Sequence, residues 1–396
     1  MPDYRPIPDD AMAEHGRITW YSFNAEGGVN DPEADTEERL ERYWSFGERY
    51  GLFDGDDLLS VVTHHEFDGR LRGARIPLAG VGGVATPPEH RRRGHVGELL
   101  ARSLADYRER GWPLSALRPF DEGFYGRYGW ATGYRYHTAT VDPAALSRAA
   151  DLVGDEGQFV RLRPDDHERL HGAYDGWLAG VTLGTARDDD WWHDRTFQHF
   201  EGELFCYAWE QAGDVRGYLL YDVTDDRTLR THEVAAADRE AYLHLLRFCR
   251  NHDSQVEEVE LVGPEADRVL AVVDRDAVTV EARSGHMVRI VDVPAALSAP
   301  SYPVDARVVL DVRDDVADWN DDRFALAVAD GAATVERTDD PADATVGIGT
   351  LSQLLVGHLP VERARVVGSL DVEDEATAET LAALFPTTDA YLPESF

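Results

Sequence analysis

The sequence predicts a mixed α/β (α+β) protein made of three successive domains. With 396 residues, the chain is long enough for two to four domains of about 100–200 residues each. Strand-like and helix-like segments alternate along it, and the order of elements in the second domain loosely echoes the order in the first. We place the three domains at residues 1–145, 146–293 and 294–396.

The first domain begins with a predicted helix followed by strands. Residues 33–50 carry apolar side chains on one broad helical face, which predicts a helix. The dipeptides Asp54-Gly55 and Asp68-Gly69 lie between apolar runs, and this pattern is typical of turns that join neighbouring strands. We therefore expect antiparallel strands on both sides of each dipeptide.

A buried strand and a helix follow. Residues 74–86 form a mostly apolar strand that ends at Pro87-Pro88, because proline has no amide hydrogen to donate to a sheet. Residues 96–111 have the apolar spacing of a helix. A short strand at 115–120 precedes a segment rich in glycine and aromatic residues, 121–142, whose end is again strand-like.

The later domains are predicted more coarsely. A helix is expected at 239–251, but no arginine-glycine turn precedes it, so we interpret the second domain as a degenerate copy of the first. Residues 294–304 are rich in Pro, Ala and Ser and predict a linker. The third domain is expected to contain strands at 305–315, 324–331 and 332–338 and a helix at 376–385.

The composition excludes several classes of protein. The chain has 75 acidic and 39 basic residues, and all of the basic residues are arginine. This surface chemistry is typical of proteins adapted to high salt, where repulsion between carboxylates is screened. A formal net charge of −36 also argues against nucleic acid as a partner, because phosphate binding needs a basic surface.

The cysteine count and the hydropathy point to a soluble protein. Cys206 and Cys249 are too few for a disulfide framework or a four-thiolate zinc site. The N-terminal residues do not resemble a signal peptide, and no run approaches the roughly 18–20 apolar residues of a membrane span. We expect a cytoplasmic protein without a membrane span.

One turn concentrates positive charge in this acidic chain. Arg91, Arg92 and Arg93 stand directly before Gly94 and a predicted helix. The first amides of a helix have no partners within it and carry the positive end of its dipole, and arginine can clamp a phosphate with paired hydrogen bonds. The pattern therefore favours an anion-binding site, although a solvated charge run at a helix start remains the alternative.

The surrounding residues carry a family resemblance. The stretch AGVGGVATPPEHRRRGHVGELL resembles the acetyl-coenzyme A motif of the GNAT N-acetyltransferases, and with DEGFYGRYGW and a third domain it resembles the enhanced intracellular survival (Eis) acetyltransferases. The resemblance implies two tandem GNAT-like domains, the second degenerate, and a C-terminal sterol-carrier-protein-like α+β domain. The implied cosubstrate-binding residues are Val84, Ala85, Thr86, Arg91, Arg92, Gly94, His95, Val96 and Gly97.

The resemblance also assigns two catalytic groups. Tyr125 would be the general acid that protonates the departing thiolate of coenzyme A, and a phenol of pKa about 10 suits that donation. The alternative is that the Gly123–Gly129 segment is only an aromatic turn packed on the sheet. The carboxylate of Phe396, the last residue, would be the base, although an α-carboxyl of pKa about 3.5 must then act through water or after desolvation. The alternative for this tail is a frayed end.

The acceptor pocket has no motif. Trp20, Phe23, Trp44, His65 and Glu394 are our candidates for its walls. His64 and His65 are adjacent on a predicted strand, so they face opposite sides and cannot hold one metal ion together. Metal was not expected anywhere in the chain.

These observations predict an acetyl-coenzyme A-dependent N-acetyltransferase. The acceptor would be a primary amine on a small molecule or peptide, such as an aminoglycoside-like compound, a polyamine or a lysine side chain. The family resemblance further implies a homo-oligomer, namely a hexamer. Two alternatives stay open at this stage: a carrier of lipids or other hydrophobic ligands, and a coenzyme A-binding regulator without catalysis.

Overall fold

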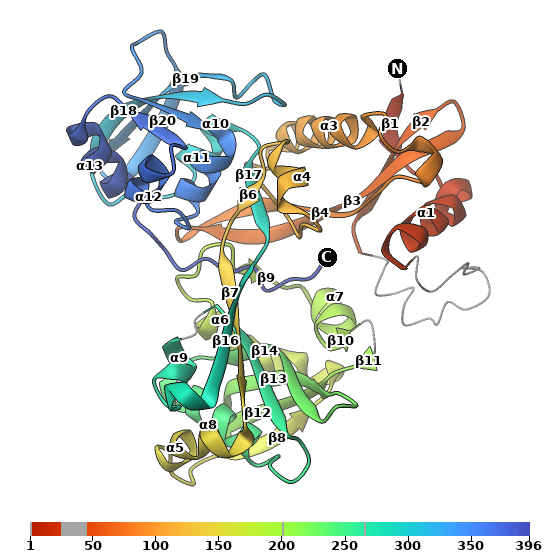
Figure 1. Cartoon of the computed structure of the whole chain (residues 1–396), viewed down its shortest axis with the longest axis vertical. Helices are drawn as coiled ribbons and strands as arrows, with labels where there is room; N and C mark the ends of the chain where they lie inside the picture. Colours follow the sequence, from red (N-terminus) through yellow and green to blue (C-terminus); the bar gives the residue numbers. More distant parts are fainter. Residues whose placement is uncertain (1, 25–45, 200–201, 265–266) are drawn as a thin grey trace. The chain divides into compact units, whose positions relative to one another are not determined.

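The computed structural model describes residues 2–24, 46–199, 202–264 and 267–396. The chain divides into two compact units (Figure 1). The larger unit comprises Met1–Tyr134, Val181–Ala186 and Gly285–Phe396, and the smaller unit comprises Arg135–Gly180 and Arg187–Ser284.

The first sheet of the larger unit has the strand order β1-β2-β3-β4-β5-β17-β6, and β9 pairs with β3. Neighbouring strands are antiparallel except β4 and β5, which are parallel. The strands are β1 (Asp3–Pro6), β2 (Glu48–Asp54), β3 (Asp57–Leu71), β4 (Ala74–Ala85), β5 (Leu114–Leu117), β6 (Ala131–Thr132), β9 (Thr185–Ala186) and β17 (Met287–Ile290).

Helices cover this sheet. The predicted helix after the arginine-glycine turn is confirmed as α3 (His95–Glu109), whose apolar face is fully buried at Leu99, Leu100 and Leu104. These side chains join the same core cluster as Val81 of β4, so the pattern of apolar residues fixes which face of α3 meets the sheet. The other helical elements are η1 (Asp9–Ala11), α1 (Met12–Asn24), η3 (Pro88–His90) and α4 (Glu122–Gly126).

The third domain forms a separate five-stranded sheet in the larger unit, with the order β20-β19-β18-β21-β22. A buried ion pair between Arg289 of β17 and Asp314 links the two sheets of this unit. Arg72 adds hydrogen bonds to the carbonyls of Leu354, Leu355 and Pro386. The elements are α10 (Val293–Ser298), β18 (Ala306–Arg313), β19 (Asp322–Ala329), β20 (Ala332–Arg337), β21 (Ala344–Gly347), α11 (Ile348–Leu355), α12 (Val361–Val366), β22 (Leu370–Val372) and α13 (Glu375–Leu384).

The smaller unit is built on a seven-stranded sheet of order β16-β7-β15-β14-β13-β12-β8, in which β14 and β15 are parallel. Helix α8 packs on it through an apolar face that includes Leu245 and Leu246. The strands are β7 (Arg135–Val141), β8 (Gln158–Leu162), β10 (Gln198–His199), β11 (Gly202–Glu203), β12 (Phe205–Gln211), β13 (Asp214–Val223), β14 (Thr228–Ala236), β15 (Glu258–Gly263) and β16 (Val278–Ser284). The helical elements are η4 (Pro143–Leu146), α5 (Ser147–Asp151), η5 (Pro164–Leu170), α6 (His171–Trp177), α7 (Asp189–Trp191), η6 (Trp192–Thr196), α8 (Arg239–Arg250), α9 (Asp267–Leu270) and η7 (Arg275–Ala277).

Two local predictions were wrong, and a third is tested only at its end. The helix expected at 33–50 lies outside the described residues up to position 45, and its last three positions, 48–50, belong to β2. Asp68-Gly69 is not a turn, because β3 continues through it and the chain reverses at Arg72-Gly73, where both residues have positive φ. The linker expected at 294–304 begins instead as helix α10, since Asp292 caps it and Pro294 is tolerated in a first turn.

The boundaries at 145 and 293 follow the chain but not the sheets. Strand β7 comes before residue 145 yet belongs to the sheet of the smaller unit. Strand β17 comes before residue 293 yet runs between β5 and β6 in the first sheet, as Figure 1 shows beside β6. The two units thus exchange strands along the chain, which a linear division into domains cannot represent.

Candidate active site

The middle of the first sheet opens at β4. Its pairing with β5 runs from Leu78 to Val81 and then stops, although β4 itself continues to Ala85. On its other edge β4 stays paired with β3, with a bulge at Gly83 and Val84, where Gly83 has a φ of 59°. Beyond Val81, the β4 edge that faced β5 therefore has no strand partner among the described residues, and its backbone groups can bind an extended ligand.

The arginine-glycine turn follows this edge directly. Thr86 is buried and its carbonyl accepts a hydrogen bond of 2.9 Å from Nε of Arg91, which ties the loop together. Arg92 has a φ of 61°, which is uncommon for a residue other than glycine. A positive φ at a residue other than glycine raises the conformational free energy of the backbone, and such residues are often found at functional sites.

Helix α3 begins without a side-chain cap. Gly94 is its N-cap residue with a φ of 86°, and a Cβ placed there would meet no atom within 4 Å. The first amides of α3, at His95, Val96 and Gly97, have no earlier carbonyl within the helix to donate to, and they lie in the chain directly after three exposed arginines. These residues fit a pyrophosphate, because they offer unpaired donors, the positive end of a helix dipole and guanidinium groups together.

Tyr125 lies on α4, a short helix capped by the Asp121 side chain, which accepts a hydrogen bond from the amide of Phe124. Its ring packs against the rings of Phe120 and Phe124 at centroid distances of 5.6 and 5.1 Å. Burial in this apolar surrounding raises the pKa of Tyr125 to about 12. Tyr125 therefore keeps its proton throughout the neutral and moderately alkaline range.

The C-terminal tail is packed along the larger unit and is not frayed. Thr182 exchanges backbone hydrogen bonds with Asp389 and Tyr391 at 2.8 and 2.9 Å. The hydroxyl of Tyr134 donates to the carbonyl of Leu392 at 2.9 Å, and Leu392 is itself buried. These contacts order the chain up to its last residues.

Phe396 lies on the open part of β4. Its ring stacks on the imidazole of His286 at 5.2 Å and contacts the rings of Phe67 and His65 at 4.9 and 5.4 Å. A Cβ at Gly82 would lie 3.3 Å from the carboxyl carbon of Phe396 and 3.1 Å from Nε2 of His65. The carboxyl group therefore lies within van der Waals reach of the β4 backbone, one residue past the end of β5 pairing.

Sequence reasoning missed two residues that support this tail. His286 is fully buried, and its Nδ1 lies 2.7 Å from the Tyr134 hydroxyl. Burial, and then the charge of Arg118, lower the pKa of His286 to about 3, so the imidazole is neutral beside the Phe396 ring. Thr185 donates a hydrogen bond of 2.8 Å to the Glu394 carboxylate. No local pattern marks either residue, since their partners are more than 100 positions away.

The acceptor-wall candidates do not form one group in the structure. His65 is brought against Phe396, and Glu394 is buried in the tail. Trp20 and Phe23 lie on α1, where Trp20 is half-buried and 58% of Phe23 is exposed. Trp44 lies outside the described residues. The neighbouring His64 points the other way from His65, toward Ser103 of α3 at 3.2 Å, as the strand alternation predicted.

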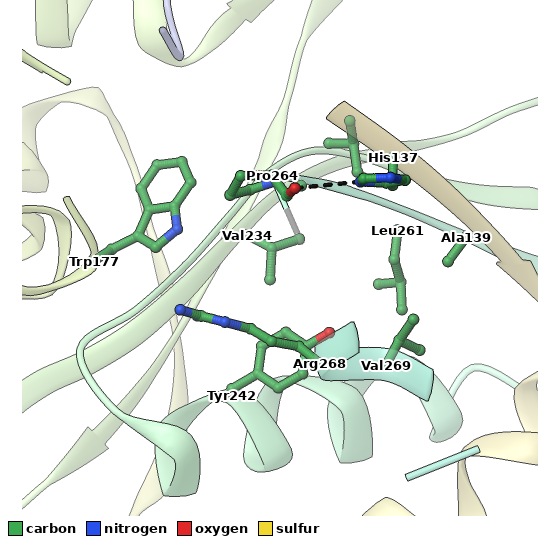
Figure 2. Close-up of a pocket in the computed structure, with 11 residues that line it drawn as sticks. His137, Ala139, Trp177, Val234, Tyr242, Leu261, Pro264, Arg268 and Val269 are labelled. Carbon is green, nitrogen blue, oxygen red and sulfur yellow. Dashed lines mark hydrogen bonds between the residues drawn. The ribbon is translucent and has the colours of Figure 1, made fainter. Parts of the chain in front are cut away.

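The smaller unit has a pocket at the corresponding point of its own sheet. The parallel pairing of β14 with β15 stops at Arg230, and the pocket opens beyond it. Figure 2 shows Trp177, Val234, Tyr242 and Arg268 around this pocket, whose lining is mainly apolar. At the start of α8, however, the Asp238 carboxylate accepts a hydrogen bond from the amide of Ala241, so the position of a phosphate is taken by a negative side chain.

Comparisons with known proteins match this architecture. A model of the GNAT acetyltransferase domain matches residues 3–133, a second GNAT model matches 183–290, and a sterol carrier protein domain model matches 293–393. An N-acetyltransferase Eis of Mycobacterium bovis is 29% identical over 85% of each chain. An uncharacterized N-acetyltransferase of Streptomyces avermitilis is 28% identical over 95% of this chain and 96% of its own length.

The solved structures agree across the whole length. Eis1 from Mycobacterium abscessus superposes with a TM-score of 0.79 at 25% identity and covers all of both chains. Over its whole length, this chain is similar to the Eis-type acetyltransferases. A GCN5-related N-acetyltransferase from Anabaena variabilis superposes with a TM-score of 0.87 at 19% identity, which supports the same fold.

The three matched models confirm the predicted fold class: two GNAT-type domains and a sterol carrier protein domain. The GNAT models and the N-acetyltransferase relatives together support an acetyltransferase, so the carrier and regulator alternatives no longer describe the protein as a whole. Among the described helices, none has the length and apolar character that crossing a bilayer requires.

Proposed function

We propose that this chain transfers the acetyl group of acetyl-coenzyme A to a primary amine in the first GNAT-type domain. The observation that carries the proposal is the convergence on β4 of an open strand edge, an uncapped helix start with arginines, and the carboxyl group of Phe396. The amine attacks the thioester carbonyl directly, so no acetylated enzyme forms.

Binding of the cosubstrate is assigned to the β4 edge and the α3 start. Val84, with Ala85 and Thr86 after it, supplies the backbone to which the pantetheine arm pairs. The pyrophosphate is held by Arg91 and Arg92 and by the amides of Gly94, His95, Val96 and Gly97. Gly97 also has a packing role, since a Cβ there would lie only 3.1 Å from the Tyr128 ring.

Charge develops on two atoms during the reaction, and the chain has groups for both. Backbone amides beside the bulge at Val84 stabilise the negative charge that grows on the thioester oxygen. Tyr125 gives its phenolic proton to the coenzyme A sulfur as the carbon–sulfur bond breaks. The phenol is protonated at the pH of the reaction, as an ordinary tyrosine would be, and its raised pKa makes it a weaker acid, so the assignment rests on the family resemblance and on the position of Tyr125 and not on its pKa.

The proton of the amine goes toward the Phe396 carboxylate, directly or through a water molecule. The Phe396 ring is packed against His286 and Phe67, which holds the carboxylate beside β4, and displacement of water from this carboxylate by the bound substrates would make it a stronger base than in water. His65, beside the same point of β4, and Glu394, two residues before the end, are proposed walls of the amine pocket. We also propose Trp20, Phe23 and Trp44, from the N-terminal part of the chain, as walls of this pocket.

The acceptors we propose are cationic amines: polyamines, aminoglycoside-like compounds or lysine side chains. The net charge of −36 supports this class, since an acidic surface attracts cations, although salt weakens the attraction. We further propose that the chain assembles as a homo-oligomer, namely a hexamer, which the mass in solution tests.

Release of free thiol from acetyl-coenzyme A in the presence of each amine tests the activity. Two properties of the chain lower the background. It contains no lysine, so it has no ε-amine of its own to acetylate. Cys206 and Cys249 are buried, and burial raises the pKa of Cys249 to about 12, so neither thiol reacts readily with the reagent in the folded protein. The absence of amine-dependent thiol release, with the cofactor tightly bound, would overturn the proposal.

Two variants test the assigned roles. Tyr125→Phe should lower kcat by about 100-fold or more with an unchanged affinity for coenzyme A, because only the acid is removed. Tyr128→Phe is its matched control and should retain most activity. Two residues appended after Phe396 should abolish turnover, because the ring stays in place while the terminal carboxylate moves away. Phe396→Leu keeps the carboxylate and should therefore retain part of the activity. Full activity of the extended chain would remove the carboxylate from the mechanism.

A further inference from the structure

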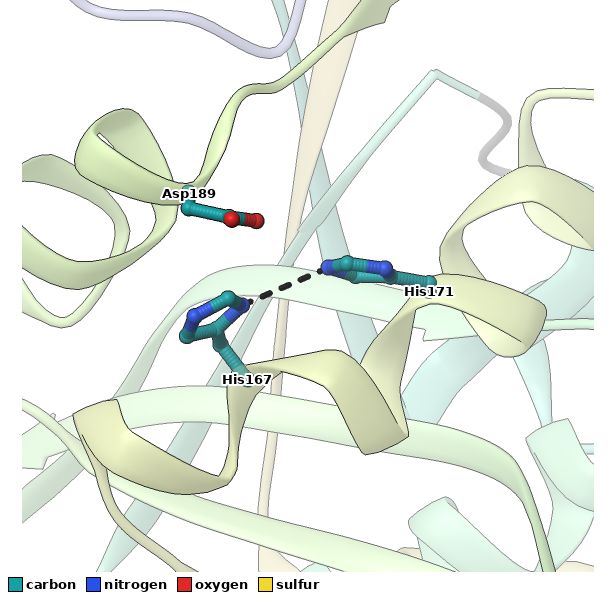
Figure 3. A group of neighbouring side chains, drawn as sticks. All are labelled: His167, His171 and Asp189. Atoms are coloured by element: carbon teal, nitrogen blue, oxygen red, sulfur yellow. Dashed lines mark hydrogen bonds between the residues drawn. The ribbon is translucent and has the colours of Figure 1, made fainter.

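Two histidines and an aspartate meet on the smaller unit, which contains none of the residues assigned to the proposed reaction. His167 lies in η5 (Pro164–Leu170), and His171 begins α6 (His171–Trp177). Asp189 begins α7, which follows later in the chain. Figure 3 shows the three side chains turned toward one another from these elements. Sequence analysis expected no metal and did not single out this His-x-x-x-His spacing.

The distances suit a metal ion. Nδ1 of His167 and Nε2 of His171 are 3.4 Å apart, and one ligand atom from each of the three residues lies within 4.8 Å of the others. Two imidazole nitrogens bound to a tetrahedral zinc ion, at about 2.0–2.1 Å each, are separated by about 3.3–3.4 Å. The two ring nitrogens thus already have the spacing of one edge of a zinc tetrahedron.

The surroundings hold the imidazoles in place. The indole of Trp192 packs against His171 at 5.3 Å and lies nearly parallel to the ring of His167 at 6.5 Å. Trp192 is itself 2% exposed, so it forms a fixed wall behind both rings. Residues that support the orientation of metal-binding histidines are a regular part of such sites.

The local charge also favours a cation. The neighbouring Asp188 carboxylate caps α7 by accepting from the amide of Trp191, whereas the Asp189 side chain has no hydrogen-bond or ion-pair partner among the described residues. The arginines nearest to these residues in the sequence, Arg169 and Arg187, are ion-paired with Glu210 at 2.9 Å and with Glu233 at 2.6 Å. Asp189 is exposed, so its side chain can rotate toward an entering ion without leaving a buried place.

We propose that His167, His171 and Asp189 form a binding site for a divalent transition metal, with Zn²⁺ as the ion of best fit. Two imidazoles and one carboxylate are a ligand set that zinc accepts, and they exclude Mg²⁺ and Ca²⁺ as preferred ions because those favour oxygen ligands. Three protein ligands leave the fourth position of a tetrahedron to water or to another ligand. The ion would cross-link η5 and α6 to α7, segments that the sequence separates by 17 residues between His171 and Asp189.

Titration of the whole, tag-free chain with Zn²⁺ after treatment with a chelator tests the site. We expect one equivalent bound per chain, and a rise in the midpoint of thermal unfolding, because an ion that binds only the folded state stabilises it. X-ray absorption of the zinc-loaded chain should report two imidazole ligands. These readouts need no acetyl-coenzyme A, so their result does not depend on the proposed acetyl transfer.

Variants assign the site to its residues. His167→Ala and His171→Ala should each weaken zinc binding by at least about tenfold and remove the thermal shift. His232→Ala is the matched control, since His232 lies 3.3 Å from the Asp222 carboxylate but belongs to no group of three potential metal ligands within the described part of the chain. Zinc affinity unchanged in both site variants would overturn the proposal. An X-ray absorption spectrum of the zinc-loaded wild type without two imidazole ligands would also overturn the proposal. This measurement does not depend on whether the variants fold.

Discussion

The two GNAT-type domains differ most at one place, the chain between the open strand and the following helix. In the first domain, residues 86–94 separate β4 from α3, and the helix begins at Gly94 with no side-chain cap. In the second, only residues 237–238 separate β14 from α8, and Asp238 caps the helix. The two sheets share their strand order around the parallel pair, so the difference is local.

The difference is one of helix capping. A capped helix satisfies its first amides from within, and the Asp238 carboxylate, which also pairs with Arg216, places negative charge where a phosphate would lie. An uncapped helix leaves the same amides to a ligand. A connection that is shorter by seven residues (nine against two) and a capping carboxylate thus distinguish the second domain, which keeps the sheet and a pocket but not the features that favour an anion.

The largest expected effect comes from transferring the carboxylate to the first domain. Gly94→Asp should raise the Kd for acetyl-coenzyme A by about 100-fold or more, because it brings a negative charge and a side chain to a residue with a φ of 86°. Isothermal titration measures the affinity. Gly94→Ala carries the backbone strain without the charge and should bind more tightly than Gly94→Asp, and equal losses in both would show that charge is not the cause.

The arginines of the loop should differ among themselves. Arg92→Ala should weaken binding of coenzyme A by about tenfold, the loss of one charge-assisted phosphate contact, and the loss should shrink as salt rises. Arg93→Ala should change the affinity little if that side chain faces solvent. A larger loss for Arg93 than for Arg92 in the same titration would reverse the assignment of the pyrophosphate.

The second domain should gain nothing from losing its cap. Asp238→Ala removes the hydrogen bond to Ala241 and should lower the free energy of unfolding by about 1 kcal/mol, measured by denaturant titration. Loss of the ion pair between Asp238 and Arg216 should change the free energy of unfolding little, because both side chains are partly exposed to solvent. Binding of acetyl-coenzyme A should remain at one per chain in the wild type and in this variant. Binding of a second equivalent of acetyl-coenzyme A by the variant would mean that the Asp238 cap alone prevents binding in this domain.

The smallest expected effect concerns the acid of the first domain. Burial disfavours the phenolate and raises the pKa of Tyr125 to about 12, so the acid form persists to higher pH than for an ordinary tyrosine near 10. The kcat should therefore not fall between pH 8 and pH 10 on account of this group. An alkaline limb with a midpoint near 10, present in the wild type and lost in Tyr125→Phe, would contradict the buried environment.

Local patterns in the sequence predicted what local forces decide. The apolar spacing from Val96 to Tyr107 and the stop at Pro87-Pro88 specify α3 and the end of β4, because periodicity and a missing donor act within a few residues. The packing of the tail, in contrast, followed from the family resemblance. The structure confirms that Leu392 is buried and that the Phe396 ring is packed, while the role of its carboxylate stays a proposal.

Predictions from the sequence were wrong or missing where contacts between distant residues determine the structure. Asp68-Gly69 has a strong turn signal, but β9 pairs with β3 at these two residues, and the ladder outweighs the local preference. His286 and Thr185 have no signal at all, since their value to the site comes from the tail that packs on them. Pro294 suggested a linker because composition alone does not reveal that Asp292 caps a helix there.

The place of β17 has a consequence for synthesis of the protein. Met287–Ile290 are buried between β5 and β6, and Arg289 carries the ion pair with Asp314. While the ribosome is still translating the first 280 codons, the strand that pairs with β5 and β6 is missing from the sheet that holds β4, although α3 and the arginine loop have already been synthesised. This sheet is therefore completed late, by a segment that is synthesised after the whole smaller unit, and the exposed edge of β5 must stay soluble until then.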